Sequence, residues 1–302
     1  MRVIPISLVL AFVPFGLVKG AEPPPSDVAE SSPSTRYGPF DLLDHRSIYG
    51  QYWFVEPLRG PEMDVDREVR VDYFHSEGRG SQLDSLNGEI EYNFNLLTVE
   101  VELPWECDSN AAFNRSTGRT IRHNSENVGS VELAVRHPLF QFVSADNFFD
   151  YTVAGAFELG IPTNSPTSKD TEFVPKLFQL ARLGDHLSVE ASAGLSMFAG
   201  PQLGGEDTLE YNLVLGYNVE HEEFPLPHVL RTIPIFELNG DAALHGPDSG
   251  TNRLSGTAGF RLNFDSIGPA QPRIGIGYVF PIDKGARDES RWGIVTSLVF
   301  EY

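Results

Sequence analysis

The stretch LTVEVELPW, residues 97–105, alternates apolar and polar side chains along its length. In an extended strand, successive side chains point to opposite faces, so Leu97, Val99 and Val101 would share one face. Glu100 and Glu102 would share the other. The stretch therefore predicts a β-strand with one apolar face and one charged face.

About twelve runs of this kind follow one another from residue 68 to the end of the chain. Most are about 8–14 residues long, whereas strands of soluble proteins are commonly ~5–6 residues long. Tilted strands of ~9–11 residues span a bilayer, so these lengths predict an all-β fold, a transmembrane antiparallel up-and-down β-barrel of about 12 strands. The expected strands are 69–75, 88–95, 96–105, 128–137, 148–160, 175–183, 186–199, 207–219, 232–245, 252–265, 272–281 and 291–302.

Alternation alone leaves a soluble periplasmic β-sandwich open, because a sandwich also has one apolar face. Two features favour the membrane. Aromatic residues occur near strand ends, where interface girdles lie, and glycines occur inside strands, where the backbone approaches a neighbour closely. The aromatic residues are Trp105, Tyr151, Tyr217, Tyr278, Trp292 and Tyr302. The glycines are Gly155, Gly194, Gly216, Gly256, Gly275 and Gly277.

Connection lengths follow the expected topology in part. With both termini in the periplasm, residues 106–127 and 161–174 would form long outer loops, and the alternate connections would be short turns. The connections near 138–147 and 220–231 are longer than this rule requires.

The net charge of the chain limits the kinds of partner that it can bind. Of the 302 residues, 22 are Lys or Arg and 42 are Asp or Glu, which gives a formal net charge of −20. Such a chain repels phosphate backbones, so no nucleic acid is expected as a partner. Cys107 is the single cysteine, which excludes an internal disulfide framework and a multi-cysteine metal site.

The N-terminal residues predict export. Arg2 precedes an apolar run from Val3 to Val18, followed by the small residues Gly20 and Ala21, the layout of a cleaved signal peptide over residues 1–20. The alternative is an uncleaved anchor, but the run is shorter than the ~20 residues of a membrane helix. Residues 21–66 would form a Pro-rich linker and a periplasmic or plug segment, and residues 67–302 the barrel.

The polar faces of the strands define an expected lumen. Charges facing lipid cost ~2–4 kcal/mol for Arg at the membrane centre, so they should point inward. Two interpretations remain open: an acidic pore that favours cations or neutral solutes, and a closed lumen in which the charges pair. The expected lumen residues are Glu89, Glu91, Glu100, Glu102, Glu132, Arg136, Glu158, Glu190, Glu210, Glu237, Asp241, Arg261 and Arg273.

Catalytic and metal chemistry find little support in the sequence. A hydrolase needs Ser and His within hydrogen-bond reach, and the histidines considered lack the context of a known barrel hydrolase. These histidines are His75, His123, His137, His186, His221, His228 and His245. The sequence His221-Glu222-Glu223 lacks the second histidine of a zinc motif. We therefore expect no enzyme, no metal site and no cofactor.

The final strand, GIVTSLVFEY (residues 293–302), ends on an aromatic residue. It resembles the C-terminal recognition strand of bacterial outer-membrane barrels, although Phe is more usual there than Tyr302. The resemblance implies that Ile294, Leu298, Phe300 and Tyr302 present this strand to the barrel-assembly machinery.

Three blocks between about residues 87 and 165 resemble the meta-pathway phenol-degradation family of outer-membrane transporters. They are EIEYNFNLLTVEVELPW, NVGSVELAVRHPLF and FELGIPT, and the usual Pro-Thr-Gly reads Pro162-Thr163-Asn164 here. The resemblance implies an outer-membrane barrel for diffusive or facilitated passage of small, hydrophobic or aromatic solutes, in contact with outer-membrane lipid. The alternatives are a structural or adhesion barrel with a closed lumen and partner-binding loops, and a barrel hydrolase.

Overall fold

The structure is a computed structural model that describes residues 47, 55–63, 67–78, 81–94, 96–114, 119–163, 170–199, 207–246 and 248–302. The signal peptide predicted over residues 1–20 lies outside these residues. So does most of the predicted linker, with the aromatic residues Tyr49, Tyr52, Trp53 and Phe54.

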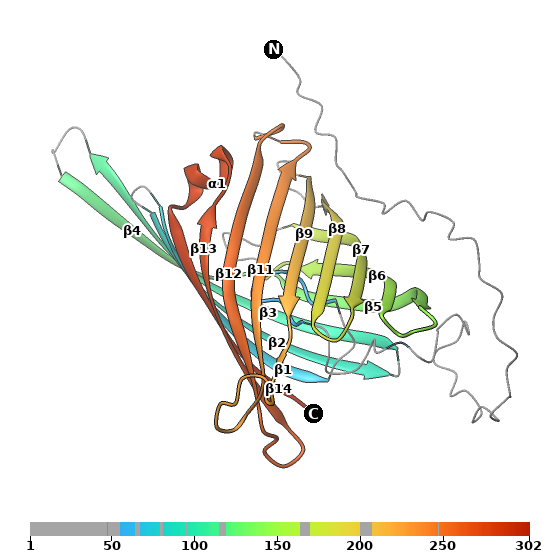
Figure 1. Cartoon of the computed structure of the whole chain (residues 1–302). Helices are drawn as coiled ribbons and strands as arrows, with labels where there is room; N and C mark the ends of the chain where they lie inside the picture. Colours follow the sequence, from blue (N-terminus) through green and yellow to red (C-terminus); the bar gives the residue numbers. More distant parts are fainter. Residues whose placement is uncertain are drawn as a thin grey trace, which may run out of the picture. The chain divides into compact units, whose positions relative to one another are not determined.

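The described chain is almost entirely β-structure (Figure 1). Its elements are β1 (Glu68–Glu77), β2 (Ser81–Phe94), β3 (Leu97–Asn114), β4 (Arg119–Val128), β5 (Val131–Val143), β6 (Phe149–Ile161), β7 (Thr171–Leu183), β8 (Leu187–Ala199), β9 (Thr208–Tyr217), β10 (Val219–Glu220), β11 (Val229–Ala243), β12 (Asn252–Phe264), β13 (Gln271–Pro281), α1 (Lys284–Glu289) and β14 (Trp292–Glu301).

The sheet closes on itself. The first and last strands pair antiparallel, with Glu68 opposite Glu301, and β9 pairs with β11 across the short β10. The described chain has fourteen strands. Two of them add no position to the ring, because β4 pairs only with the far part of β3, and the two-residue β10 continues β9 along β11. Twelve strands therefore form the ring. The predicted antiparallel barrel of 12 strands is confirmed, and closure leaves no row of unpaired backbone groups facing lipid.

Strand β13 shows how the two faces divide. Ile274 and Ile276 are 47% and 41% exposed on the outer face, whereas Arg273 is 2% exposed on the inner face. Tyr217, Tyr278 and Tyr302 are likewise exposed among the outer apolar residues. A belt of exposed aliphatic and aromatic side chains around a closed barrel meets hydrocarbon, so the chain is an outer-membrane β-barrel and not a sandwich.

The β3–β4 hairpin differs most from expectation. Residues 106–127 were predicted to be a loop, which is wrong, because β3 runs to Asn114 and pairs with β4 from Arg119 onward. Eighteen residues of strand reach about 60 Å, more than a bilayer requires. The hairpin therefore projects beyond the neighbouring strands (Figure 1), and Trp105 lies within β3 instead of at its end.

Two connections are shorter than expected. Strand β5 continues to Val143, so the turn to β6 covers residues 144–148, and the turn after β10 covers residues 221–228. These shorter turns fit the barrel topology better than the sequence suggested. Among the described residues, no helix is both long and apolar enough to cross a membrane, and α1 has six residues.

Candidate functional site

Residues 55–63 (VEPLRGPEM), here called the lumen segment, lie inside the barrel. Val55, Leu58 and Met63 are at most 1% exposed. The segment contacts inward-facing side chains of β1, β5, β8, β11, β12 and β13, which lie all around the ring. Two prolines and a glycine prevent regular secondary structure here, so its backbone donors and acceptors must find partners on the wall.

Glu56 provides the main ionic attachment. Its carboxylate lies 2.8 Å from Arg261 Nη1, 3.2 Å from Arg273 Nη1 and 3.5 Å from Arg70 Nη1. The three arginines come from β12, β13 and β1, and all four side chains are buried. We call these four residues the Glu56 cluster. Removal of this shared carboxylate would leave Arg261 without its ion-pair partner, while Arg70 would keep Asp72 and Arg273 would keep Glu301.

The carbonyl group of Pro57 strengthens this attachment. It accepts hydrogen bonds from Arg261 Nη2 at 2.9 Å and from Arg70 Nη2 at 3.0 Å. The same two arginines therefore bind both the side chain of Glu56 and the backbone that follows it. This arrangement fixes the direction of the lumen segment as well as its position.

Two carboxylates on the barrel strands accept hydrogen bonds from backbone N–H groups of the lumen segment. Glu237 on β11 accepts from Leu58 N, from Arg59 N at 3.2 Å and from Gly60 N at 3.3 Å. Glu190 on β8 accepts from Val55 N at 3.0 Å. Buried N–H groups without acceptors are costly, and these two carboxylates supply what strand pairing would otherwise provide.

Glycines of the wall make room for the apolar side chains of the segment. A Cβ added at Gly275 would lie 2.5 Å from Leu58 Cδ2, and one added at Gly277 would lie 2.9 Å from Leu58 Cδ1. At Gly216, the added atom would lie 2.1 Å from Val55 Cγ2. The predicted close approach at these three glycines is thus to the lumen segment.

The interior is not polar throughout, in contrast to the simple division expected from alternation. Leu58 and Val55 belong to a buried apolar cluster with inward-facing Phe178, Val214 and Ile233. This apolar side of the lumen packs against the segment as the core of a soluble protein would.

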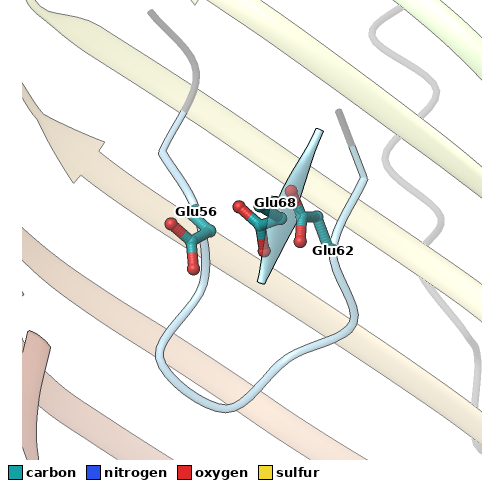
Figure 2. A group of neighbouring side chains, drawn as sticks. All are labelled: Glu56, Glu62 and Glu68. Atoms are coloured by element: carbon teal, nitrogen blue, oxygen red, sulfur yellow. The ribbon is translucent and has the colours of Figure 1, made fainter. Parts of the chain in front are cut away.

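The opposite side of the lumen is acidic. In Figure 2, Glu56 and Glu62 lie on the two arms of the turn made by the lumen segment, with Glu68 of β1 between them. One carboxylate oxygen from each lies within 4.8 Å of the other two. Arg70 approaches this group, with Nη1 3.8 Å from Glu62 Oε2.

Beside this group, a cavity of about 140 Å³ lies between the lumen segment and strands β1, β2, β3, β5, β6 and β7. Its basic lining residues are Arg59, Arg70 and Lys176. Its acidic lining residues are Glu62, Asp72, Glu89, Glu100, Glu102, Glu132 and Glu158. Seven carboxylates against three basic groups leave an excess of four negative charges if all are ionised.

The structure brings most of the expected lumen residues into these contacts. Arg136 forms an ion pair with Glu91 and lies 3.4 Å from Glu100. Lys176 Nζ lies 2.5 Å from Glu158 and 3.3 Å from Glu210. Glu89, Glu102 and Glu132 line the cavity, while Glu190, Glu237, Arg261 and Arg273 hold the lumen segment. Asp241 stands apart, paired with Arg253 at 2.8 Å.

Several contributing residues were not foreseen. Arg70 and Asp72 follow the same alternation as the rest of β1 and could have been assigned to the lumen from it. Glu56 and Glu62 lie in a stretch without periodicity, which carries no sign of where its side chains point. The C-terminal residues Ile294, Leu298, Phe300 and Tyr302 are all exposed on the outer face, and their role in assembly stays a prediction.

Comparison with known proteins supports the fold. No family model matches the chain, and no curated protein matches it, so the resemblance to the phenol-degradation family stays a prediction. Among solved structures, the COG4313 outer membrane channel from Pseudomonas putida F1 matches with a TM-score of 0.51 and 14% identity, over 82% of this chain and 100% of that one.

Two porins match less well. The KdgM porin matches with a TM-score of 0.38 and 14% identity, and the NanC porin with 0.44 and 11%. Each match covers 78% of this chain and 98% of the other. At these identities, the Pseudomonas putida channel shares the barrel fold with this chain.

Proposed function

We propose that this protein is an outer-membrane channel for small neutral or cationic solutes, narrowed by the lumen segment. The observation that carries the proposal is the acidic cavity of about 140 Å³ beside the segment, inside a closed membrane barrel. The similar structure from Pseudomonas putida is described as a channel, which agrees with passage through the barrel.

Charge is the basis of the proposed selectivity. A narrow passage lined by excess carboxylates lowers the barrier for cations and raises it for anions. Neutral solutes, including the hydrophobic or aromatic compounds that the family resemblance suggests, would pass without this electrostatic barrier. Anionic solutes would be the poorest substrates.

The contacts of several described histidines favour a channel over a hydrolase. His75 lies 2.8 Å from Asp84, His228 lies 3.1 Å from Asp265, and His186 and His221 contact backbone carbonyl groups. The pairing of Nδ1 with a carboxylate at His75 and His228 matches the orienting half of a serine triad. A hydrolase also needs a serine hydroxyl at the other ring nitrogen, and within the described chain no serine hydroxyl bonds to either of these two rings. We propose that the protein catalyses no reaction.

Reversal potentials in planar bilayers test the proposal. With a tenfold KCl gradient across the membrane, the reconstituted protein should show a reversal potential of the sign that marks cation selectivity. Liposome swelling should be faster with a neutral sugar than with an anionic one of similar size. Anion selectivity would contradict the charge argument, and the absence of both current and swelling would favour a structural barrel.

A further inference from the structure

Three glutamates on the first strands of the barrel form a compact group of oxygen ligands. Glu89 on β2 and Glu100 and Glu102 on β3 each place one carboxylate oxygen within 4.8 Å of the other two. All three line the cavity beside the lumen segment. Glu89 and Glu102 are direct cross-strand neighbours, and Glu132 on β5 lies opposite Glu102 on its other side.

Such a row should be unfavourable by itself. Like charges directly opposite each other across strands repel, and the repulsion grows when water is excluded. Glu89, Glu102 and Glu132 nevertheless occupy three adjacent strands in one row. A cation among them would convert the repulsion into attraction.

Glu89 gives a second and independent indication. It is 6% exposed, and its Oε1 atom is buried without a hydrogen-bond partner. Its cross-strand neighbour Arg70 directs Nε to Asp72 at 2.7 Å and its other nitrogens to the lumen segment. A buried carboxylate oxygen without a donor is costly, so this one lacks a ligand that the protein itself does not provide.

Asn87 adds a neutral oxygen to the same cavity. Its Nδ2 atom donates to Glu102 Oε1 at 2.5 Å, which orients the amide, and its Oδ1 atom is buried without a donor. The basic residues nearby leave Glu89 Oε1 without a hydrogen bond. Arg136 pairs with Glu91 and, among the three glutamates, lies 3.4 Å from Glu100 Oε2. Lys176 binds Glu158 and Glu210, and Arg59 donates to Ser255 Oγ at 2.8 Å and stacks over Phe74.

We propose that Glu89, Glu100 and Glu102, with the amide oxygen of Asn87, bind a calcium ion in this cavity. Calcium takes six to eight oxygen ligands in flexible geometry, so carboxylates, an amide and water suit it. A cavity of about 140 Å³ holds an ion together with a few waters, each of which occupies about 30 Å³. The proposal departs from the expectation of no metal site, and it does not depend on solute passage.

The position of the ion has a structural consequence. The cavity is bounded on one side by Gly60, Pro61 and Glu62 of the lumen segment. A calcium ion would neutralise part of the charge that faces Glu62, so it would stabilise the barrel with the segment in place. Calcium should therefore raise the temperature at which the barrel unfolds.

The direct test is isothermal titration of the full mature chain with CaCl₂, refolded into detergent without lipopolysaccharide and washed with EDTA. We expect one calcium ion per chain, with half-saturation below about 1 mM. Glu89→Gln and Glu102→Gln should each weaken binding by about tenfold or more. Glu222→Gln, in the exposed turn after β10, is the control and should bind as the parent does.

A second measurement keeps the test decisive if a variant folds poorly. Calcium at 5 mM should raise the temperature of heat-modifiable gel migration for the parent, and by less for whichever of Glu89→Gln and Glu102→Gln folds. If the parent binds no calcium, or if both variants bind it as the parent does, the proposal is wrong.

Discussion

Arg261 Nη1 lies 2.8 Å from Glu56 Oε1, and this pair joins the barrel wall to a segment that precedes the first strand of the barrel. Both side chains are buried, and Arg70 and Arg273 approach the same carboxylate. The barrel thus encloses an ionic cluster whose carboxylate, Glu56, belongs to the chain segment before the first strand.

Removal of that negative charge should weaken the whole assembly. Glu56→Gln leaves the guanidinium groups of Arg70, Arg261 and Arg273 close together without their shared carboxylate. Breaking a buried ion pair by removing one partner costs about 3–5 kcal/mol. The temperature of heat-modifiable gel migration should fall by several degrees, whereas Glu222→Gln should leave it unchanged; equal temperatures for Glu56→Gln and the parent would contradict the role of the cluster.

The glycine contacts predict a steric effect that a partner substitution relieves. Gly275→Ala places a Cβ 2.5 Å from Leu58 Cδ2, and overpacking of this kind costs about 1–3 kcal/mol. Gly88→Ala is the matched control, since an added Cβ there meets no atom within 4 Å. In the Leu58→Ala background, where Leu58 Cδ2 is absent, Gly275→Ala should cost less free energy of unfolding than it does in the parent. The difference between the two costs, measured by urea unfolding, is the coupling energy of the two residues. Strict additivity would show that the two residues do not touch.

Lys176 should limit cation selectivity. It supplies one of the three positive charges of the cavity and binds Glu158 and Glu210. Lys176→Gln should therefore shift the reversal potential in a KCl gradient further toward the cation value. Lys284→Gln, on the exposed side of α1, should leave it unchanged; a shift toward the anion value in Lys176→Gln would exclude the cavity from the conduction path.

Helix α1 should loosen in acid. Burial acts to raise the pKa of Asp283, but hydrogen bonds from Ala286 N–H and the Asn252 amide outweigh it and hold this pKa below its usual value. A lowered folded-state pKa gives stability that is present above the unfolded-state pKa of about 3.9 and is lost as pH falls through the folded value. Hydrogen exchange at residues 284–289, corrected for intrinsic rates, should quicken below about pH 4. In Asp283→Ala, hydrogen exchange at these residues should already be fast at pH 7, because loss of the N-cap side chain destabilises the helix by about 1 kcal/mol.

The strand alternation predicted the barrel because lipid contact and lumen contact impose opposite polarity on neighbouring residues. Glu100 and Glu102, which alternate with Val99 and Val101, are the plainest case, and their inward contacts follow from this alternation. The alternation fails where both faces are apolar. Val174 and Phe178 are buried, and Phe178 shares an apolar cluster with Val55 and Leu58 of the lumen segment. Strand β7 begins at Thr171, several residues before the predicted start at 175.

The contacts of the lumen segment could not be predicted from sequence patterns, although a plug was one of the two roles expected for the stretch that precedes the barrel. Glu56, Leu58 and Glu62 are each adjacent to a proline, in a stretch that has neither a strand nor a helix period. Their positions are set by partners far along the chain, namely Arg261, Gly275 and Arg136. Long-range pairing of this kind leaves no local signal, whereas the glycines on β9 and β13 did indicate that something approaches the wall closely.

The most direct test of the central claim is single-channel conductance in planar bilayers of the parent protein beside a variant that lacks residues 55–63. The account predicts small or brief openings for the parent and a larger, steady conductance for the deletion variant, both cation-selective. Gel migration that shows a folded barrel in each sample is the control. Equal conductance in the two proteins, or no current from a folded deletion variant, would contradict a channel narrowed by its own N-terminal segment.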